Sequence, residues 1–262
     1  MSEEVVRWTV LVGSAFAAGV LNSIAGGGTL LTFPALISFG IEPGFGVGVQ
    51  ANATSTVALV PGSIAGAWGY RRQIEGAWPF VWLLLVPSVV GAAIGTVLVI
   101  AMPAKTFDAL IPWLLLTATV LFLLQPVFRR FVAHRDGDLP AWPVRAALVV
   151  FQLLVAIYGG YFGAGIGILM LSSLGLMGIG DIHRMNAVKT ILAAAINLVS
   201  VAVFVYCEAV VWRPALVMMI GSIAGGYVGA TVGQRMPREV VRWIVIALGI
   251  GLTAYYFARP VT

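Results

Sequence analysis

Charged residues divide this chain into long uncharged stretches. Reading from one charge to the next gives eight of them: 8–41, 43–70, 76–104, 109–128, 146–180, 190–207, 214–234 and 243–258. A helix that crosses a bilayer needs about 20 consecutive, predominantly apolar residues, and most of these stretches are long enough. The pattern therefore predicts an all-α membrane protein that crosses the bilayer several times.

Two of the stretches, 8–41 and 146–180, are too long for one crossing, and glycines interrupt both. The first contains Gly26, Gly27 and Gly28, and the second contains Gly163 and Gly165. As one straight helix, 35 residues would run about 52 Å, against a hydrocarbon core of about 30 Å. Each segment must bend, break or fold back, and the glycines mark the place. Paired glycine-broken segments of this kind point to a transporter site near the bilayer midplane.

The two broken segments belong to an internal repeat. From Asn52 to Pro103 the first half maps onto the second with a constant shift of 134 residues. The identities are Asn52/Asn186, Trp78/Trp212, Ser88/Ser222, Gly91/Gly225, Gly95/Gly229, Met102/Met236 and Pro103/Pro237. The glycine loops need a shift of 137, which pairs Gly26 with Gly163. The prediction is an N-terminal repeat over 1–128, a linker loop over 129–145 and a C-terminal repeat over 146–262.

Basic residues in the loops favour one topology of these repeats. If each broken segment crosses once, the repeats are parallel and the basic residues divide nine to six. If each returns to the side on which it started, the repeats are inverted and the division is eleven to four. The positive-inside rule favours the second. We predict inverted repeats, each a folded-back segment plus three spans, with both termini outside; two short crossings per broken segment would give the same parity.

Composition narrows the function classes. Charged residues make up 10% of the chain and hydrophobic residues 60%, far from the roughly 25% charge of a soluble domain. The net charge of +5 reflects basic loops rather than a nucleic-acid surface. One cysteine, Cys207, excludes a disulfide or an iron–sulfur cluster within the chain. Without HExxH, GxSxG or P-loop motifs, we expect no enzyme and no cofactor.

The glycine loops suggest an anion site. A broken helix offers free N–H groups and a positive dipole end, and glycine lets a ligand approach the backbone. Asn22 precedes the first loop, Asn52 and Asn186 occupy matching helices, and the repeat register sets Ser55 against Lys189. An intramembrane lysine is by default a functional hypothesis, although Lys189 could equally snorkel to water. The asparagines could instead cap helices or bridge spans.

Two motifs resemble those of a known family. Residues 22–36, NSIAGGGTLLTFPAL, followed by 51–54, ANAT, resemble the first motif of the TauE/SafE sulfite exporter family. The second motif is similar to residues 160–165, GYFGAG, followed by 181–189, DIHRMNAVK. The resemblance covers essentially the whole chain. One departure is Ala164, which stands where the first loop has Gly27.

The resemblance implies a secondary transporter that exports sulfite or small organosulfur anions across a bacterial plasma membrane. The predicted substrate site comprises Asn22, Gly26, Gly27, Gly28, Thr29, Asn52, Ser55, Gly163, Ala164, Gly165, Arg184, Asn186 and Lys189. The expected partners are a small anionic substrate, the lipid bilayer and a possible second copy of the chain, with no nucleic acid and no metal. The alternatives are an anion channel of the same architecture and a transporter of another small oxyanion.

Overall fold

A computed structural model describes residues 3–24, 26–42, 46–131, 141–179, 181–231 and 238–259. In that part of the chain every regular element is helical, so the all-α prediction is confirmed. The elements are α1 (Glu3–Ile24), α2 (Thr29–Ala35), the π-helical turn η1 (Leu36–Gly40), α3 (Val47–Gly69), α4 (Trp78–Ala101), α5 (Ala104–Phe131), α6 (Trp142–Tyr161), α7 (Ile166–Leu176), α8 (Ile182–Tyr206), α9 (Trp212–Thr231) and α10 (Arg238–Ala258).

Six of these helices are long and apolar enough to cross a membrane: α1, the Ala104–Val127 part of α5, α4, α6, α8 and α9. Helix α3 is 23 residues long but is not among the six. It carries Asn52, Thr54, Ser55 and Ser63 as buried polar side chains. Its polarity is tolerated because other helices surround it, since lipid could not satisfy these groups.

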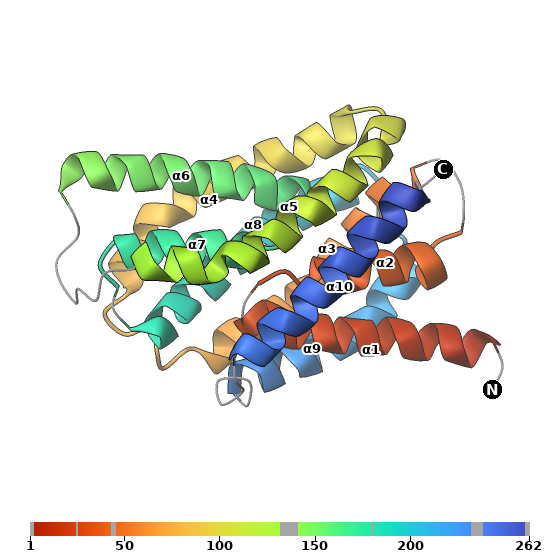
Figure 1. The fold of residues 1–262 in the computed structure, drawn as a ribbon, viewed down its shortest axis with the longest axis horizontal. Helices are drawn as coiled ribbons and strands as arrows, with labels where there is room; N and C mark the ends of the chain where they lie inside the picture. The colour runs from red at the N-terminus through yellow and green to blue at the C-terminus, as the bar shows by residue number, and fades with distance from the viewer. Residues whose placement is uncertain are drawn as a thin grey trace.

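The first glycine-broken segment folds back on itself. Helix α1 ends near the middle of the molecule's long axis, and α2 with η1 returns toward the N-terminal end (Figure 1). At that end, Arg7 Nη2 donates a hydrogen bond to the carbonyl of Gly40 over 3.3 Å. The start and the end of the segment therefore lie side by side, and the segment does not cross as one helix.

The second broken segment has the same form. Helix α6 enters from the opposite end, stops near the middle, and α7 returns toward the end from which α6 came (Figure 1). Helices α9 and α10 extend between the middle and the end where α1 begins, and α3, α5 and α8 run past the middle (Figure 1). The predicted linker loop, 129–145, falls partly on residues 132–140, which lie outside the described part of the chain.

Helices of the two halves pack against one another in a crossed pattern. Helix α1 packs along α9, and α6 packs along α4, while α3 contacts both α8 and α9. Glycines allow these backbones to approach: a Cβ added to Gly91 would lie 2.6 Å from the carbonyl of Leu153. The Gly91/Gly95 and Gly225/Gly229 pairs have the spacing of small residues at helix–helix contacts, and the structure places them there.

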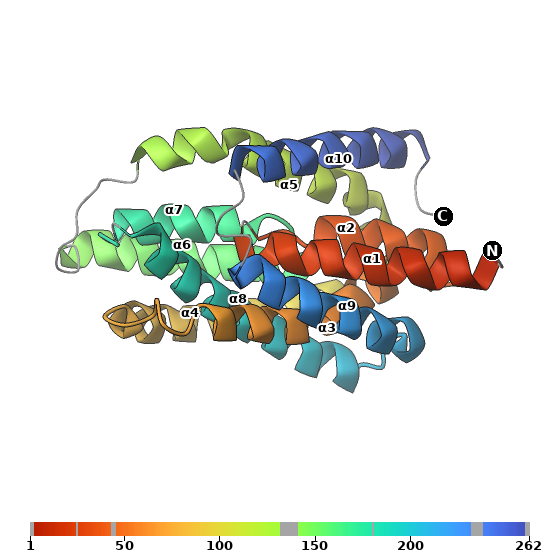
Figure 2. The ribbon, with the colours of Figure 1, turned by 90° about the horizontal axis from the view of Figure 1, so that it is seen from below.

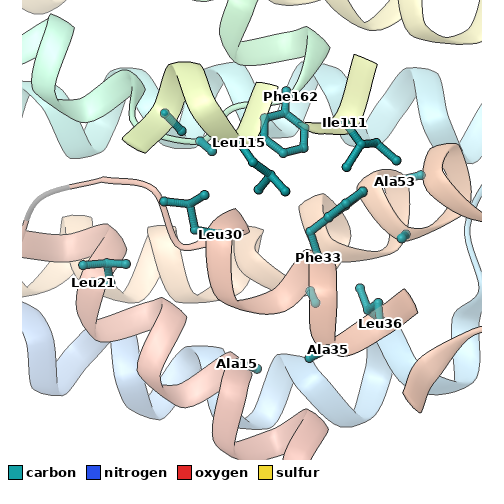
Figure 3. Close-up of a cluster of buried hydrophobic side chains, with 14 of the residues drawn as sticks. Ala15, Leu21, Leu30, Phe33, Ala35, Leu36, Ala53, Ile111, Leu115 and Phe162 are labelled. Carbon is teal, nitrogen blue, oxygen red and sulfur yellow. The ribbon is translucent and has the colours of Figure 1, made fainter. Parts of the chain in front are cut away.

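Helices α5 and α10 form a separate layer over the broken helices (Figure 2). Beneath that layer, a buried apolar cluster joins the first break to the second and to α5 (Figure 3). The rings of Phe33 and Phe162 meet edge to face with centroids 5.4 Å apart. Leu115 and Ile111 of α5 cover them. The breaks are thus held in the protein interior, away from lipid.

Candidate functional site

The two glycine loops contact each other at the centre of the molecule. Gly26 and Gly27 have φ angles of +76° and +114°, and Gly163 and Gly165 have φ angles of +80° and +81°. This left-handed region favours glycine because a Cβ is sterically penalised there. A Cβ on Gly26 would also lie 2.6 Å from Gly167 Cα. The breaks therefore need glycine both for their backbone conformation and for their close approach.

A small, largely enclosed cavity lies where the breaks meet α3 and α8. Its volume is about 10 Å³, about the space of one water molecule. Ten residues line it: Asn22, Thr29, Thr56, Leu59, Gly159, Phe162, Gly163, Ile166, Ala193 and Asn197. Four of them, Asn22, Thr29, Thr56 and Asn197, bring polar side chains, and none is charged. Helix α7 begins at the cavity, with Gly165 as an N-cap that has no side-chain cap bond.

The lining residues are related by the repeat register. The loop shift of 137 pairs Asn22 with Gly159 and Thr29 with Ile166, and the shift of 134 pairs Leu59 with Ala193. Both members of each pair line the cavity. The cavity therefore lies between corresponding positions of the two halves.

The two halves differ at one pair of positions in the cavity lining. In the first half, Asn22 Nδ2 donates to Ser63 Oγ over 3.0 Å. The matching positions of the second half hold Gly159 and Asn197. Gly159 has no side chain, so no amide equivalent to that of Asn22 reaches Asn197 from there, and both residues line the cavity.

Lys189 lies behind the cavity rather than in its lining. The residue is 1% exposed, and its Nζ donates to the carbonyls of Asn22 over 3.2 Å and Ser23 over 3.0 Å. It therefore caps the C-terminal end of α1, where carbonyls lack helical partners and the dipole is negative. The alternative that Lys189 snorkels to water is wrong, because its side chain is buried. Asn22, which lines the cavity, separates the charged end of Lys189 from it.

Two of the predicted asparagines, Asn52 and Asn186, are buried near the breaks but do not line the cavity. Asn52 Nδ2 donates to the carbonyl of Tyr161, at the end of α6, over 2.9 Å. The Oδ1 atoms of Asn52 and Asn186 are buried without a hydrogen-bond partner. Ser55 Oγ lies 2.5 Å from Thr32 Oγ1, one turn into α2. These residues hold the breaks in position.

The other predicted residues divide between the breaks and the surface. Gly28 is the N-cap of α2, and the carbonyl of the buried Ala164 accepts a hydrogen bond from the Tyr158 hydroxyl over 2.9 Å. Arg184 is exposed in the first turn of α8 and does not join this group.

Sequence reasoning did not select two of the polar residues that line the cavity, Thr56 and Asn197. A lone amide within a span is typical of a polar contact between helices, a role that Gln152 has through its bond to Ser88 Oγ at 2.8 Å. The repeat register was the available signal for Asn197, because it corresponds to Ser63, the partner of Asn22.

The long apolar helices, the two interior breaks and the polar cavity between them define a multi-pass membrane transporter. The chain belongs to the Sulfite exporter TauE/SafE family, whose profile matches residues 11–256. It is 28% identical over 244 residues to a "Probable membrane transporter protein" of Haemophilus influenzae, covering 91% of this chain and 90% of that protein.

Other relatives have similar names. The "Probable membrane transporter protein ORF9" of a Sinorhizobium species is 28% identical over 94% of this chain and 91% of its own. The "Probable membrane transporter protein YfcA" of Escherichia coli K12 is 26% identical over 94% of this chain and 87% of its own. No solved structure matches the chain.

Proposed function

We propose that the protein is a bacterial inner-membrane secondary transporter that exports sulfite or a small organosulfur oxyanion. The observation that carries this proposal is the enclosed polar cavity between the two breaks. Its position at the middle of the molecule is where broken-helix transporters bind substrate. The family name supplies the substrate class, and the cavity supplies the candidate site.

The electrostatics of the cavity favour an anion. Helix α7 directs its uncapped N-terminal end, through Gly163 and Ile166, at the cavity, and such an end attracts negative charge. The Lys189 ammonium lies 3.2 Å from the carbonyl of Asn22, whose side chain forms part of the wall. No carboxylate belongs to the lining.

The hydrogen-bonding groups also suit an oxyanion. The Thr56 hydroxyl already donates to the carbonyl of Asn52 over 2.8 Å, so the side-chain donors left in the lining are the amide groups of Asn22 and Asn197 and the Thr29 hydroxyl. Such groups can donate to several oxygens of one small anion at once, and bonds to a charged acceptor are the stronger kind. Arg184 is too far along α8 toward the surface to contribute in this arrangement.

Inverted repeats and alternating access complete the mechanism. The crossed packing of α1 on α9 and of α6 on α4 is what two units related by a pseudo-twofold axis would produce. The cavity of about 10 Å³ holds roughly one water, less than sulfite needs. We infer that this conformation has a closed site, and that rocking of one unit against the other opens it. The membrane potential favours the exit of an anion by about 2.3 kcal/mol per elementary charge for every 100 mV.

The test is counterflow in proteoliposomes with a panel of sulfite, organosulfonates, sulfate and phosphate. We expect saturable sulfite counterflow. Thr29→Val removes a cavity hydroxyl, and Thr117→Val makes the same change on the exposed surface of α5. Thr29→Val should raise KM roughly tenfold or more, because a bond to a charged group is worth about 1.5–3 kcal/mol. Thr117→Val should leave it unchanged.

Two results would contradict the proposal in different ways. Flux that does not saturate and shows no counterflow would favour the anion channel over the carrier. Saturable flux of phosphate or another oxyanion without sulfite would keep the site and overturn the substrate.

A further inference from the structure

Helices α1 and α6 both end inside the molecule, so each directs carbonyl groups and a negative dipole end at the protein interior. At the end of α1 this charge is matched by the Lys189 ammonium, which bonds to the carbonyls of Asn22 and Ser23 at 3.2 and 3.0 Å. The lysine comes from α8, in the other half of the chain. One of the two interior helix ends therefore has a built-in cation.

The corresponding position at the other end has no charge. The shift of 134 sets Ser55 at the position of Lys189, and its hydroxyl lies 2.5 Å from Thr32 Oγ1. At the end of α6, Asn52 Nδ2 donates to the carbonyl of Tyr161, and Thr96 Oγ1 donates to the carbonyl of Gly160 over 3.1 Å. These groups are all neutral, so the dipole end of α6 lacks the compensation that α1 has.

A second observation points to a ligand at the same place. Asn52 is 1% exposed, and its Oδ1 is buried without a hydrogen-bond partner. The amide orientation follows from its contact, because the Tyr161 carbonyl can only accept and must face Nδ2. The Oδ1 atom of the same amide is therefore an unpaired acceptor on a side chain that is bonded to the last residue of α6.

The pseudo-equivalent asparagine differs from Asn52 in having a cation on its own helix face. Asn186 Oδ1 also lacks a hydrogen-bond partner, but Asn186 stands three residues before Lys189 on α8, so the two side chains share a helix face. Its oxygen has a buried ammonium on that face. Asn52 has Ser55 at the same spacing.

We infer that a sodium ion binds at the C-terminal end of α6, between Asn52 Oδ1 and the last carbonyls of that helix, in the role that the Lys189 ammonium has at α1. Neutral amide and carbonyl oxygens suit a monovalent ion, whereas calcium and magnesium sites use carboxylates. Among the described residues, no group of three or more acidic, histidine or cysteine side chains forms a site for a divalent metal. Half-helix C-terminal ends are established sodium ligands in broken-helix transporters.

The test measures the thermal unfolding midpoint of the purified full chain in detergent, in sodium chloride and in choline chloride at equal ionic strength. Wild type should unfold at a higher temperature in sodium. Ser55→Lys supplies an ammonium at the matching position and should abolish the difference, whereas Ser55→Met, similar in length and uncharged, should keep it. Asn52→Leu removes the unpaired oxygen and should also abolish the difference.

An equal midpoint in the two salts for wild type would overturn the inference, as would a full sodium effect in Asn52→Leu or Ser55→Lys. If Asn52→Leu does not fold, the comparison of Ser55→Lys with Ser55→Met still decides. The measurement needs no substrate, so a sodium effect without sulfite flux would count against the proposed function and leave this site standing.

Discussion

At the scale of single residues, the broken helices depend on side chains contributed by other helices. Helix α1 has no basic residue in its own last turn, and Lys189 of α8 supplies the missing cation. At the end of α6, the neutral amide of Asn52 of α3 donates a hydrogen bond to the carbonyl of Tyr161. Buried carbonyls at a helix end are costly without such partners. The polar residues of α3 and α8 are therefore structural supports of the breaks.

Replacement of Lys189 by methionine keeps the apolar stem and removes the cap. We expect it to lower the free energy of unfolding by about 1–3 kcal/mol, because the carbonyls of Asn22 and Ser23 lose a buried donor. The matched control is Lys105→Met, which changes an exposed lysine in the first turn of α5 and should shift stability by less than about 0.5 kcal/mol. Thermal unfolding in detergent measures both, and equal midpoints would contradict the capping role.

At the scale of elements, the breaks are defined by backbone conformation and by their contact with each other. Gly26 combines a φ of +76° with a neighbour, Gly167 Cα, at 2.6 Å from its hypothetical Cβ. The mutual contact fixes the distance between α2 and α7, and hence the shape of the cavity between them.

Gly26→Ala should therefore cost about 1–3 kcal/mol of stability, from left-handed strain and from separation of the two loops. Gly13→Ala is the control: it lies within α1, and its added Cβ meets nothing within 4 Å. That change should be neutral or stabilising by up to about 1 kcal/mol. Thermal unfolding midpoints of the two variants give the comparison. A midpoint of Gly26→Ala equal to that of Gly13→Ala would show that the loops need not touch.

At the scale of the whole molecule, the arrangement predicts which ends face which side of the membrane. Both termini and the α8–α9 connection lie at one end, and the α3–α4 connection lies at the other (Figure 1). We predict from the basic residues of the second end, Arg71 and Arg72 among them, that it faces the cytoplasm.

A membrane-impermeant thiol reagent tests this assignment in intact cells. Cys207, the single cysteine and exposed after α8, should react from outside. In a Cys207→Ser background, a cysteine replacing the exposed Arg72 should react only after permeabilisation. The reverse pattern would invert the orientation, and labelling of both from outside would contradict inverted repeats with both termini outside.

Much of this fold was readable from the sequence because its signals are local. Uncharged stretches predicted the positions of the helices. Glycines in segments too long for one crossing predicted the positions of the breaks. Whether a broken segment returns or crosses twice was not readable, because both have the same parity. The Arg7–Gly40 contact shows that the first segment ends beside its start, which both topologies share and a single straight crossing does not. Likewise, the partners of Lys189 lie 167 and 166 residues away, beyond any local pattern.

The candidate site was less accessible for the same reason. Asn22 and Thr29 were predicted from the first motif and do line the cavity. Asn197 was missed because a lone amide within a span looks like a helix–helix contact. Asn197 of α8 and Gly159 of α6 line the same cavity because α6 and α8 are in contact. That contact joins residues far apart in the sequence.

The central claim is that substrate binds in this cavity, and sulfite counterflow in Asn197 variants tests it most directly. Asn197→Ser introduces the residue that stands at the corresponding position, Ser63, and retains a hydroxyl. Asn197→Leu fills the same volume with an apolar group. We predict a raised KM with counterflow preserved in Asn197→Ser, and no counterflow in folded Asn197→Leu. Wild-type counterflow in Asn197→Leu would contradict the claim and move the site away from the two breaks.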